Sequence, residues 1–166
     1  MESIDWNKVD KKIKRFSLEN EIKTAKCVDV YDGDTIQLVF PLQNQLYRWT
    51  CRLTGIDTPE LRTRNKTEKK FGYIVRNTLR EKILNKMVVV ECGEFDKYGR
   101  LLGKIFLKTD YYEKQIGGNG GVSTNIENLL SINQWLIDNK YAFSYDGGKK
   151  NNWEEYLTNN DVIKND

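Results

Sequence analysis

The chain has 166 residues, of which 31% are charged and 39% hydrophobic, and it contains no histidine. This length and composition are typical of one globular domain. Without histidine, the usual zinc sites, Ser-His-Asp triads and histidine bases are excluded, so any catalysis must depend on carboxylates, Lys, Arg, hydroxyl groups or a hard metal ion. No apolar run approaches the roughly 20 residues of a membrane span, so no membrane partner is expected.

Residues 1–21 are predicted to be an N-terminal extension. Val9, Ile13 and Phe16 recur there at helical spacing behind Asp5, which predicts a short amphipathic helix. The first twenty residues alternate charges instead of forming the apolar stretch of a secretory signal. An intracellular location is therefore expected.

The pattern of β-strands begins at residue 22. Strands are predicted over residues 22–31 and 36–40, as a hairpin around the turn at Asp32-Gly33, and over residues 46–56. Three cysteines (Cys27, Cys51 and Cys92) lie far apart in apolar, β-rich stretches. This placement predicts free buried thiols rather than disulfides or a zinc site.

A polar, basic loop follows the break at Thr58-Pro59, and an amphipathic helix is predicted over residues 67–84. Its expected apolar stripe consists of Phe71, Ile74, Val75, Thr78, Leu79 and Ile83. Between residues 62 and 86, Lys and Arg greatly outnumber the two acids, Glu68 and Glu81. Such a surplus suits a polyanionic partner, although a solvated helix face would explain it as well.

Two more strands, at residues 87–91 and 100–107, flank a turn at 96–99. An insertion follows at 109–124; its glycine run at 117–121 lacks the Gly-Lys-Ser/Thr of a phosphate loop and is interpreted as a linker. Helices are predicted at 126–139 and 152–157, with a basic, aromatic, turn-rich segment at 141–150. The expected domain spans residues 22–158, followed by a tail at 159–166. The fold class is predicted as α+β, a five-stranded OB-type Greek-key β-barrel with about three packed helices.

Acidic residues cluster in two motifs, Asp-Gly-Asp-Thr at 32–35 and Asp-Thr-Pro-Glu at 57–60. Asp34 and Asp57 each lie at a predicted strand end, and strand ends can meet in a small barrel. Two neighbouring carboxylates repel each other unless a cation lies between them. Oxygen ligands favour a hard ion, either Ca²⁺ or Mg²⁺. Taken alone, the first motif is also an ordinary hairpin turn, and the second is also a loop or helix entry.

Two arginines are candidates to face these acids. Arg52 precedes Asp57 by five residues, so the two side chains point to opposite faces of an extended strand unless Gly55 permits a bulge. Arg100 follows a turn in a third motif, Asp-Lys-Tyr-Gly-Arg at 96–100. Two arginines opposite two carboxylates would form a phosphate site. Either arginine alone is more simply interpreted as an ion-pair partner.

The three motifs in this order, with Arg52 five residues before the second, resemble the staphylococcal nuclease (thermonuclease) family from about Lys23 to Leu157. The resemblance implies one Ca²⁺ per site, with Mg²⁺ as the alternative. Its ligands would be Asp34, Asp57 and the main-chain carbonyl of Thr58, supported by Asp32.

The resemblance also implies catalytic and nucleotide-binding roles. Glu60 would orient or deprotonate the attacking water, and Arg52 and Arg100 would clamp the phosphate. Three further positions would contact bound nucleotide: Lys97, Tyr98 and Tyr145.

The resemblance implies a Ca²⁺-dependent endonuclease that hydrolyses DNA and RNA with little sequence specificity and leaves 3′-phosphates. The protein is expected to be a monomer. It is also expected to prefer single strands, because an OB-type cleft accepts splayed bases more readily than a duplex. One alternative is a non-catalytic nucleic-acid-binding module of the same fold; the intact acids and arginines favour the enzyme. Another is a protein-interaction domain that uses its aromatic residues (Trp6, Trp49 and Trp153).

Overall fold

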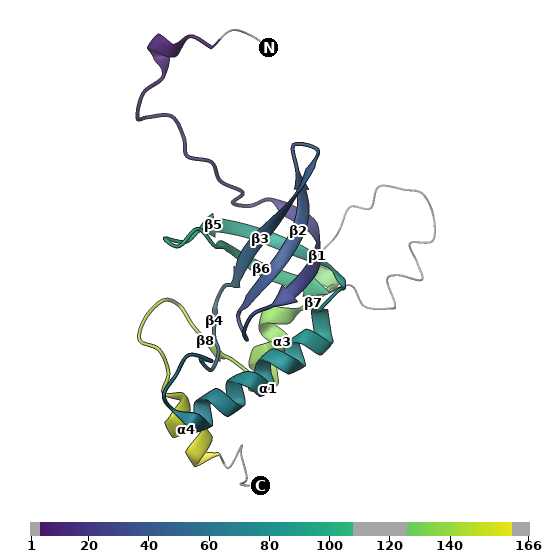
Figure 1. Cartoon of the computed structure of the whole chain (residues 1–166), viewed down its shortest axis with the longest axis vertical. Coiled ribbons are helices and arrows are strands. Elements are labelled where there is room, and N and C mark those ends of the chain that lie inside the picture. Colours follow the sequence, from purple (N-terminus) through teal and green to yellow (C-terminus); the bar gives the residue numbers. More distant parts are fainter. Residues whose placement is uncertain (1–3, 108–125, 161–166) are drawn as a thin grey trace, which may run out of the picture.

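Five strands form a closed barrel in the computed structural model, which describes residues 4–107 and 126–160 (Figure 1). They are β1 (Ile22–Val30), β2 (Thr35–Leu42), β3 (Gln45–Leu53), β5 (Met87–Phe95) and β6 (Leu101–Leu107). The order along the sheet is β3-β2-β1-β5-β6, and a parallel pairing between β3 and β6, with Cys51 opposite Leu101, closes the barrel. The predicted OB-type α+β fold is confirmed.

The barrel interior is filled by alternate residues of the strands. Leu38, Cys51 and Ile105 are among the fully buried side chains, and β-bulges interrupt the register of β1 and β5. The prediction of free buried thiols is confirmed for all three cysteines. Burial raises the pKa of Cys27 and of Cys92 to about 11, so both thiols stay protonated and unreactive at neutral pH.

The long helix α1 (Lys66–Ile83) crosses one end of the barrel, beside α3 (Figure 1). Asn65 begins it by accepting a hydrogen bond from the amide of Glu68 at 2.8 Å. Its buried face contains Phe71, Gly72, Val75, Leu79 and Ile83, much as the apolar spacing predicts. Ile74, assigned to that stripe, is instead 41% exposed.

The second predicted helix is shorter than expected. The segment at 126–139 contains a 3-10 turn, η2 (Ile126–Asn128), a short strand, β7 (Leu130–Ser131), that pairs with β6, and only then α3 (Ile132–Asp138). The helix begins at Ile132 because Ser131 caps its first turn. The last helix, α4 (Trp153–Asn159), packs Trp153 against Phe71, with 5.8 Å between the ring centroids.

A second, two-stranded sheet lies beyond the barrel. It consists of β4 (Ile56–Asp57) and β8 (Phe143–Ser144), which pair antiparallel. A turn through Gly55, whose φ of +74° suits glycine, joins β3 to β4. This turn, rather than a bulge, separates Arg52 from Asp57.

The N-terminal segment contains one turn of 3-10 helix, η1 (Trp6–Lys8), capped by Asp5. The longer amphipathic helix that the spacing predicts is not formed, because Val9, Ile13 and Phe16 are all exposed and bury no common face. Leu18, by contrast, is fully buried in the core. The predicted insertion at 109–124 and most of the tail lie outside the described residues. Among those residues, every helix is too short or too polar to span a bilayer.

Candidate active site

The two acidic loops pack directly against each other at Gly33. A Cβ atom at this position would lie 2.8 Å from the Thr58 Cβ and Oγ1 atoms and 2.9 Å from Val75 Cγ1. Only glycine therefore allows the 32–35 turn to pack this closely on the 57–60 loop and on α1. This contact brings together two sequence motifs that the chain places far apart.

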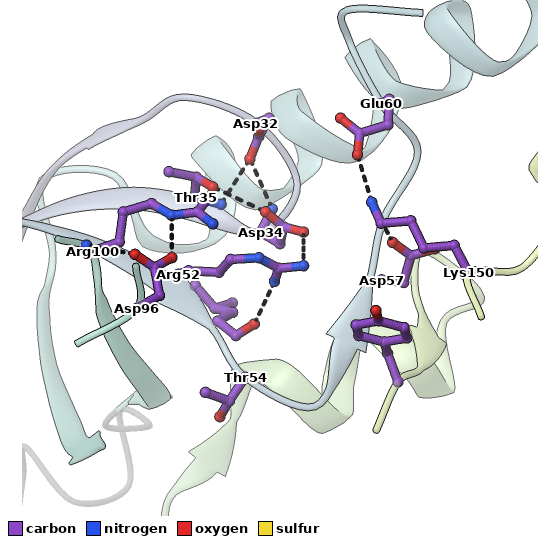
Figure 2. Close-up of polar contacts among 12 residues, drawn as sticks. Asp32, Asp34, Thr35, Arg52, Thr54, Asp57, Glu60, Asp96, Arg100 and Lys150 are labelled. Atoms are coloured by element: carbon purple, nitrogen blue, oxygen red, sulfur yellow. Dashed lines mark hydrogen bonds and ion pairs between the residues drawn. The ribbon is translucent and has the colours of Figure 1, made fainter. Parts of the chain in front are cut away.

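Asp34 is buried in this turn and paired with Arg52 (Figure 2). The distance from Asp34 Oδ2 to Arg52 Nη2 is 3.2 Å, and the Thr35 hydroxyl donates to Asp34 Oδ1 at 3.0 Å. The pairing follows from register, because Thr35 lies opposite Arg52 in the β2–β3 ladder. Burial raises the pKa of Asp34 to about 6 against the opposing effect of Arg52.

Asp32 supports the same turn without contacting the arginine. Its Oδ1 accepts hydrogen bonds from the amides of Asp34 at 3.2 Å and of Thr35 at 2.8 Å. Its carboxylate also helps to raise the pKa of Asp34 by charge repulsion. This placement is compatible with the supporting role that the sequence resemblance implies.

Asp57 and Glu60 are bridged by Lys150, a residue to which the sequence analysis assigned no role. Lys150 Nζ lies 3.1 Å from Asp57 Oδ1 and 2.7 Å from Glu60 Oε1 (Figure 2). Burial opposes the charge on Lys150, but the hydrogen bonds and charges of the two acids outweigh it and raise its pKa. The Glu60 amide is fixed separately, because it donates to Glu68 Oε1 at 3.0 Å.

The surroundings of Asp57 fit a cation. Its side chain is 1% exposed, and its Oδ1 accepts no well-aligned hydrogen bond from the described residues. The Lys150 ammonium therefore stands where a positive ion would otherwise balance this carboxylate. Together with Asp34 and the main-chain carbonyl of buried Thr58, Asp57 offers the hard oxygen donors that Ca²⁺ prefers.

That donor set is incomplete by itself. Within residues 4–107 and 126–160, no three acidic or thiol side chains converge in a cluster able to hold a metal ion. Ca²⁺ takes 6–8 oxygen ligands. Water and substrate oxygens would have to provide the remainder.

Both arginines line one open pocket of about 400 Å³, together with the three predicted nucleotide-binding residues, Lys97, Tyr98 and Tyr145. Arg100 is fixed there by Asp96, whose Oδ2 accepts from Arg100 Nε at 2.7 Å. Asp96 Oδ1 also accepts from the amides of Tyr98 at 2.8 Å and Arg100 at 2.9 Å. Burial raises the pKa of Asp96, but these hydrogen bonds outweigh it and hold that pKa below its usual value.

The aromatic side chains of the pocket differ in their attachment. Tyr98 is 72% exposed and lies beneath the Arg100 guanidinium, 5.5 Å from Cζ to ring centroid. Tyr145 is tied to the β3–β4 turn, because its amide donates to the Gly55 carbonyl at 2.9 Å. The segment after β8 therefore contributes Tyr145 to the arginine pocket and Lys150 to the acids.

Figure 2 shows Arg52 extended toward Asp34, and Asp57 turned toward Lys150. The structure thus gathers the predicted residues into two neighbouring groups, the arginine pocket with Asp34 and the pair Asp57 and Glu60. A chain of contacts joins the groups, from Arg52 through Asp34 to the Gly33–Thr58 packing.

Sequence reasoning also missed Asn133 of α3. Its buried side chain donates to the Thr54 carbonyl at 2.8 Å and accepts from the Ile105 amide at 2.9 Å. It therefore fixes the turn between Arg52 and Asp57 to β6. One signal was available, a polar residue among the apolar positions of the 126–139 segment. Lys150 carried no comparable signal in a segment with several polar and charged residues.

The closed barrel defines an OB-type fold, and its candidate site combines arginines with acids. Residues 50–161 match the family described as "Staphylococcal nuclease homologue", and the chain belongs to that family. The chain is 30% identical to an uncharacterized protein of Methanocaldococcus jannaschii over 141 residues, 73% of this chain and 58% of that protein.

Two named nucleases are also similar. The thermonuclease of Staphylococcus intermedius is 30% identical over 93 residues, which cover 55% of this chain and 53% of that protein. The micrococcal nuclease of Shigella flexneri is 29% identical over 121 residues, 73% of this chain and 58% of that protein. The chain spans somewhat more than half the length of these curated relatives.

Proposed function

We propose that the protein is a Ca²⁺-dependent endonuclease that hydrolyses DNA and RNA with little sequence specificity, prefers single strands and leaves 3′-phosphates. The observation that carries this proposal is the pocket shared by Arg52 and Arg100, which adjoins the buried Asp34. Membership of the staphylococcal nuclease family and similarity to two named nucleases support it.

The arginines account for phosphate binding and for part of the rate enhancement. Arg100 is held by Asp96 and Arg52 by Asp34, so both guanidinium groups are positioned before substrate arrives. Negative charge grows on the non-bridging phosphate oxygens during attack. Preorganised cations therefore stabilise the transition state more than the ground state.

Glu60 is proposed to orient the attacking water and accept its proton. Its side chain is about half exposed, and its carboxylate contacts Lys150. Exchange of this contact for water would leave Oε1 free to act as the base. Its backbone is held by Glu68, so this exchange needs movement of side chains only.

Asp34, Asp57 and the Thr58 carbonyl are the residues that would hold Ca²⁺. When bound, the ion would supply a fixed positive charge beside the phosphate oxygens. Because the protein donors are too few to fill its coordination shell, the ion is expected to bind weakly alone and more tightly with a nucleotide.

A second candidate is a nucleic-acid-binding module without catalysis. The specific observation in its favour is Lys150, a cation of the protein itself that pairs with both Asp57 and Glu60. If that pairing persists when a strand binds, the pocket would hold phosphate and leave it intact.

One assay separates these candidates. Single-stranded DNA is incubated with the protein in Ca²⁺ or in chelator, and both cleavage and mobility shift are followed. The nuclease cuts only with Ca²⁺, and its products carry 3′-phosphates. A binder shifts the DNA under both conditions and cuts it under neither, an outcome that would refute the proposed activity.

A further inference from the structure

A second hollow, of about 440 Å³, is formed by other residues than the arginine pocket. Tyr31, which directly precedes the 32–35 turn, lines one part of it together with Arg62 from the loop after Glu60. The helix α1 lines another part with Lys69, Tyr73 and Arg76. None of these five side chains takes part in the proposed chemistry.

Most of the positive charge in this hollow lacks an acidic partner. The one acid of its lining, Asp29, is paired with Arg80 at 3.1 Å. Arg62, Lys69 and Arg76 form no ion pair with any described carboxylate. Arg76 donates instead to a neutral amide oxygen, Asn77 Oδ1, at 3.2 and 3.0 Å. An unneutralised concave surface of this kind attracts a polyanion.

Two exposed aromatic rings alternate with these cations. Tyr31 is 46% and Tyr73 40% exposed. The Arg62 Cζ atom lies 5.7 Å from the Tyr31 ring centroid, and the Arg76 Cζ atom lies 4.7 Å from that of Tyr73. Planar rings and guanidinium groups interleaved in a basic groove are the features on which single-stranded bases stack while their phosphates are neutralised.

The position of the hollow favours a nucleic-acid strand over another polyanion. Tyr31 and Arg62 stand on the same two loops as Asp34 and Glu60. Arg52 connects the first pocket to Asp34, and the three residues from Asp34 to Tyr31 span at most about 10 Å. A strand held at the first pocket would pass the acids and reach the second hollow within a few nucleotides.

We propose that this hollow is a second subsite for the substrate strand. It would bind backbone phosphates through Arg62, Lys69 and Arg76 and stack a base on Tyr31 or Tyr73, beyond the bond to be cut. The location relative to that bond rests on the proposed nuclease function, whereas the binding itself does not require cleavage.

The test compares a double variant, Arg62→Ala/Arg76→Ala, with a control of equal charge change, Lys26→Ala/Arg48→Ala. The control residues are exposed on β1 and β3, outside the hollow. Binding of labelled 12-nucleotide and 3-nucleotide oligothymidylates is measured in chelator over a range of salt concentrations. Circular dichroism and thermal unfolding confirm that both variants are folded.

We expect the hollow variant to lose affinity for the 12-mer, with a salt dependence (log K against log [salt]) shallower by about 1.4, because two phosphate contacts on a single strand are removed. Affinity for the 3-mer should change less than twofold. Tyr73→Ala should weaken 12-mer binding by about tenfold through lost stacking. The control variant should bind both oligomers almost as well as the wild type.

Three results would overturn the subsite. The first is a hollow variant that keeps the affinity and salt slope of the wild type. The second is a control variant that loses as much affinity for the 12-mer as the hollow variant. The third is a hollow variant whose binding of the 3-mer is weakened as much as its binding of the 12-mer. A wild-type protein that binds the 12-mer through the hollow but never cuts it with Ca²⁺ would refute the nuclease proposal alone. Failure of one proposal is thus distinguishable from failure of the other.

Discussion

Arg100 and Asp57 illustrate two ways of holding a functional side chain. Arg100 is fixed within its own turn, by a carboxylate four residues earlier and by backbone amides that the same carboxylate orders. Asp57 depends on remote segments: Gly33 supports the adjoining Thr58, β8 pairs with its strand, and Lys150 balances its charge. Phosphate binding should therefore tolerate changes elsewhere in the chain, whereas the position of Asp57 should be sensitive to distant ones.

Glu60→Gln tests the pair Asp57 and Glu60 most directly. Loss of a positioned base typically lowers a rate by about 10²–10⁴-fold, and glutamine keeps the shape of the side chain. Cleavage of single-stranded DNA should fall by this amount while binding in chelator stays near the wild-type level. Unchanged cleavage would remove Glu60 from the catalytic role.

Arg100→Ala tests the arginine pocket. We expect about a 10²–10³-fold loss of cleavage, because a preorganised donor to the developing phosphate charge is removed. Lys104→Ala is the matched control, since Lys104 is an exposed cation on β6 that pairs with Glu91. Equal activity of the two variants would contradict the proposed clamp.

Gly33→Ala tests whether Asp57 and Glu60 depend on the contact between the 32–35 turn and the 57–60 loop. The added Cβ must displace Thr58 or Val75, and overpacking of this kind costs about 1–3 kcal/mol. Unfolding by urea and the rate of cleavage are both measured. Cleavage should fall further than 12-mer binding, because Arg100 and its turn lie outside this contact. A fully stable and active variant would show that the loops need not pack so closely.

Asp96→Asn tests the local hydrogen-bond network at Arg100. The pKa of Asp96 is lowered in the folded protein, so its ionised form stabilises the fold at any pH above the unfolded value near 3.9. The variant should be less stable than the wild type by about 1–2 kcal/mol at pH 7. This difference in the free energy of unfolding should shrink as the pH falls from about 4 through the lowered pKa. Urea unfolding of both proteins at several pH values measures the difference. A difference independent of pH would contradict the stabilising role of the ionised Asp96.

Lys150→Ala tests the competing cation, with Lys149→Ala as the neighbouring control. Removing an ammonium that pairs with Asp57 should strengthen Ca²⁺ binding by up to about fivefold, the size of an ion pair worth about 1 kcal/mol. Calorimetry with Ca²⁺ alone and with a nucleotide measures this change and also the coupling between the two ligands. Equal Ca²⁺ affinity in both variants would mean that Lys150 does not compete for the site.

Strand and helix patterns predicted the barrel well because they are local. Alternating residues of β1 and β2 and the stripe on α1 followed the expected periodicities, and the turn at 96–100 followed from its own motif. The N-terminal helix failed for a related reason. Val9, Ile13 and Phe16 have helical spacing but bury no common face: all three are exposed, although the Phe16 ring lies 6.1 Å from the Phe95 ring between centroids. An isolated short helix is marginal in water.

The sequence by itself predicted the positions of the strands and of α1, most of their inward residues and the turn at 96–100, since each depends on neighbours along the chain. Tertiary structure alone decided which remote groups meet. Gly33 against Thr58, Lys150 between Asp57 and Glu60, and Asn133 beneath the β3–β4 turn have partners far away in the sequence. Such contacts depend on close packing and on the pairing of buried charges, which no short-range pattern encodes.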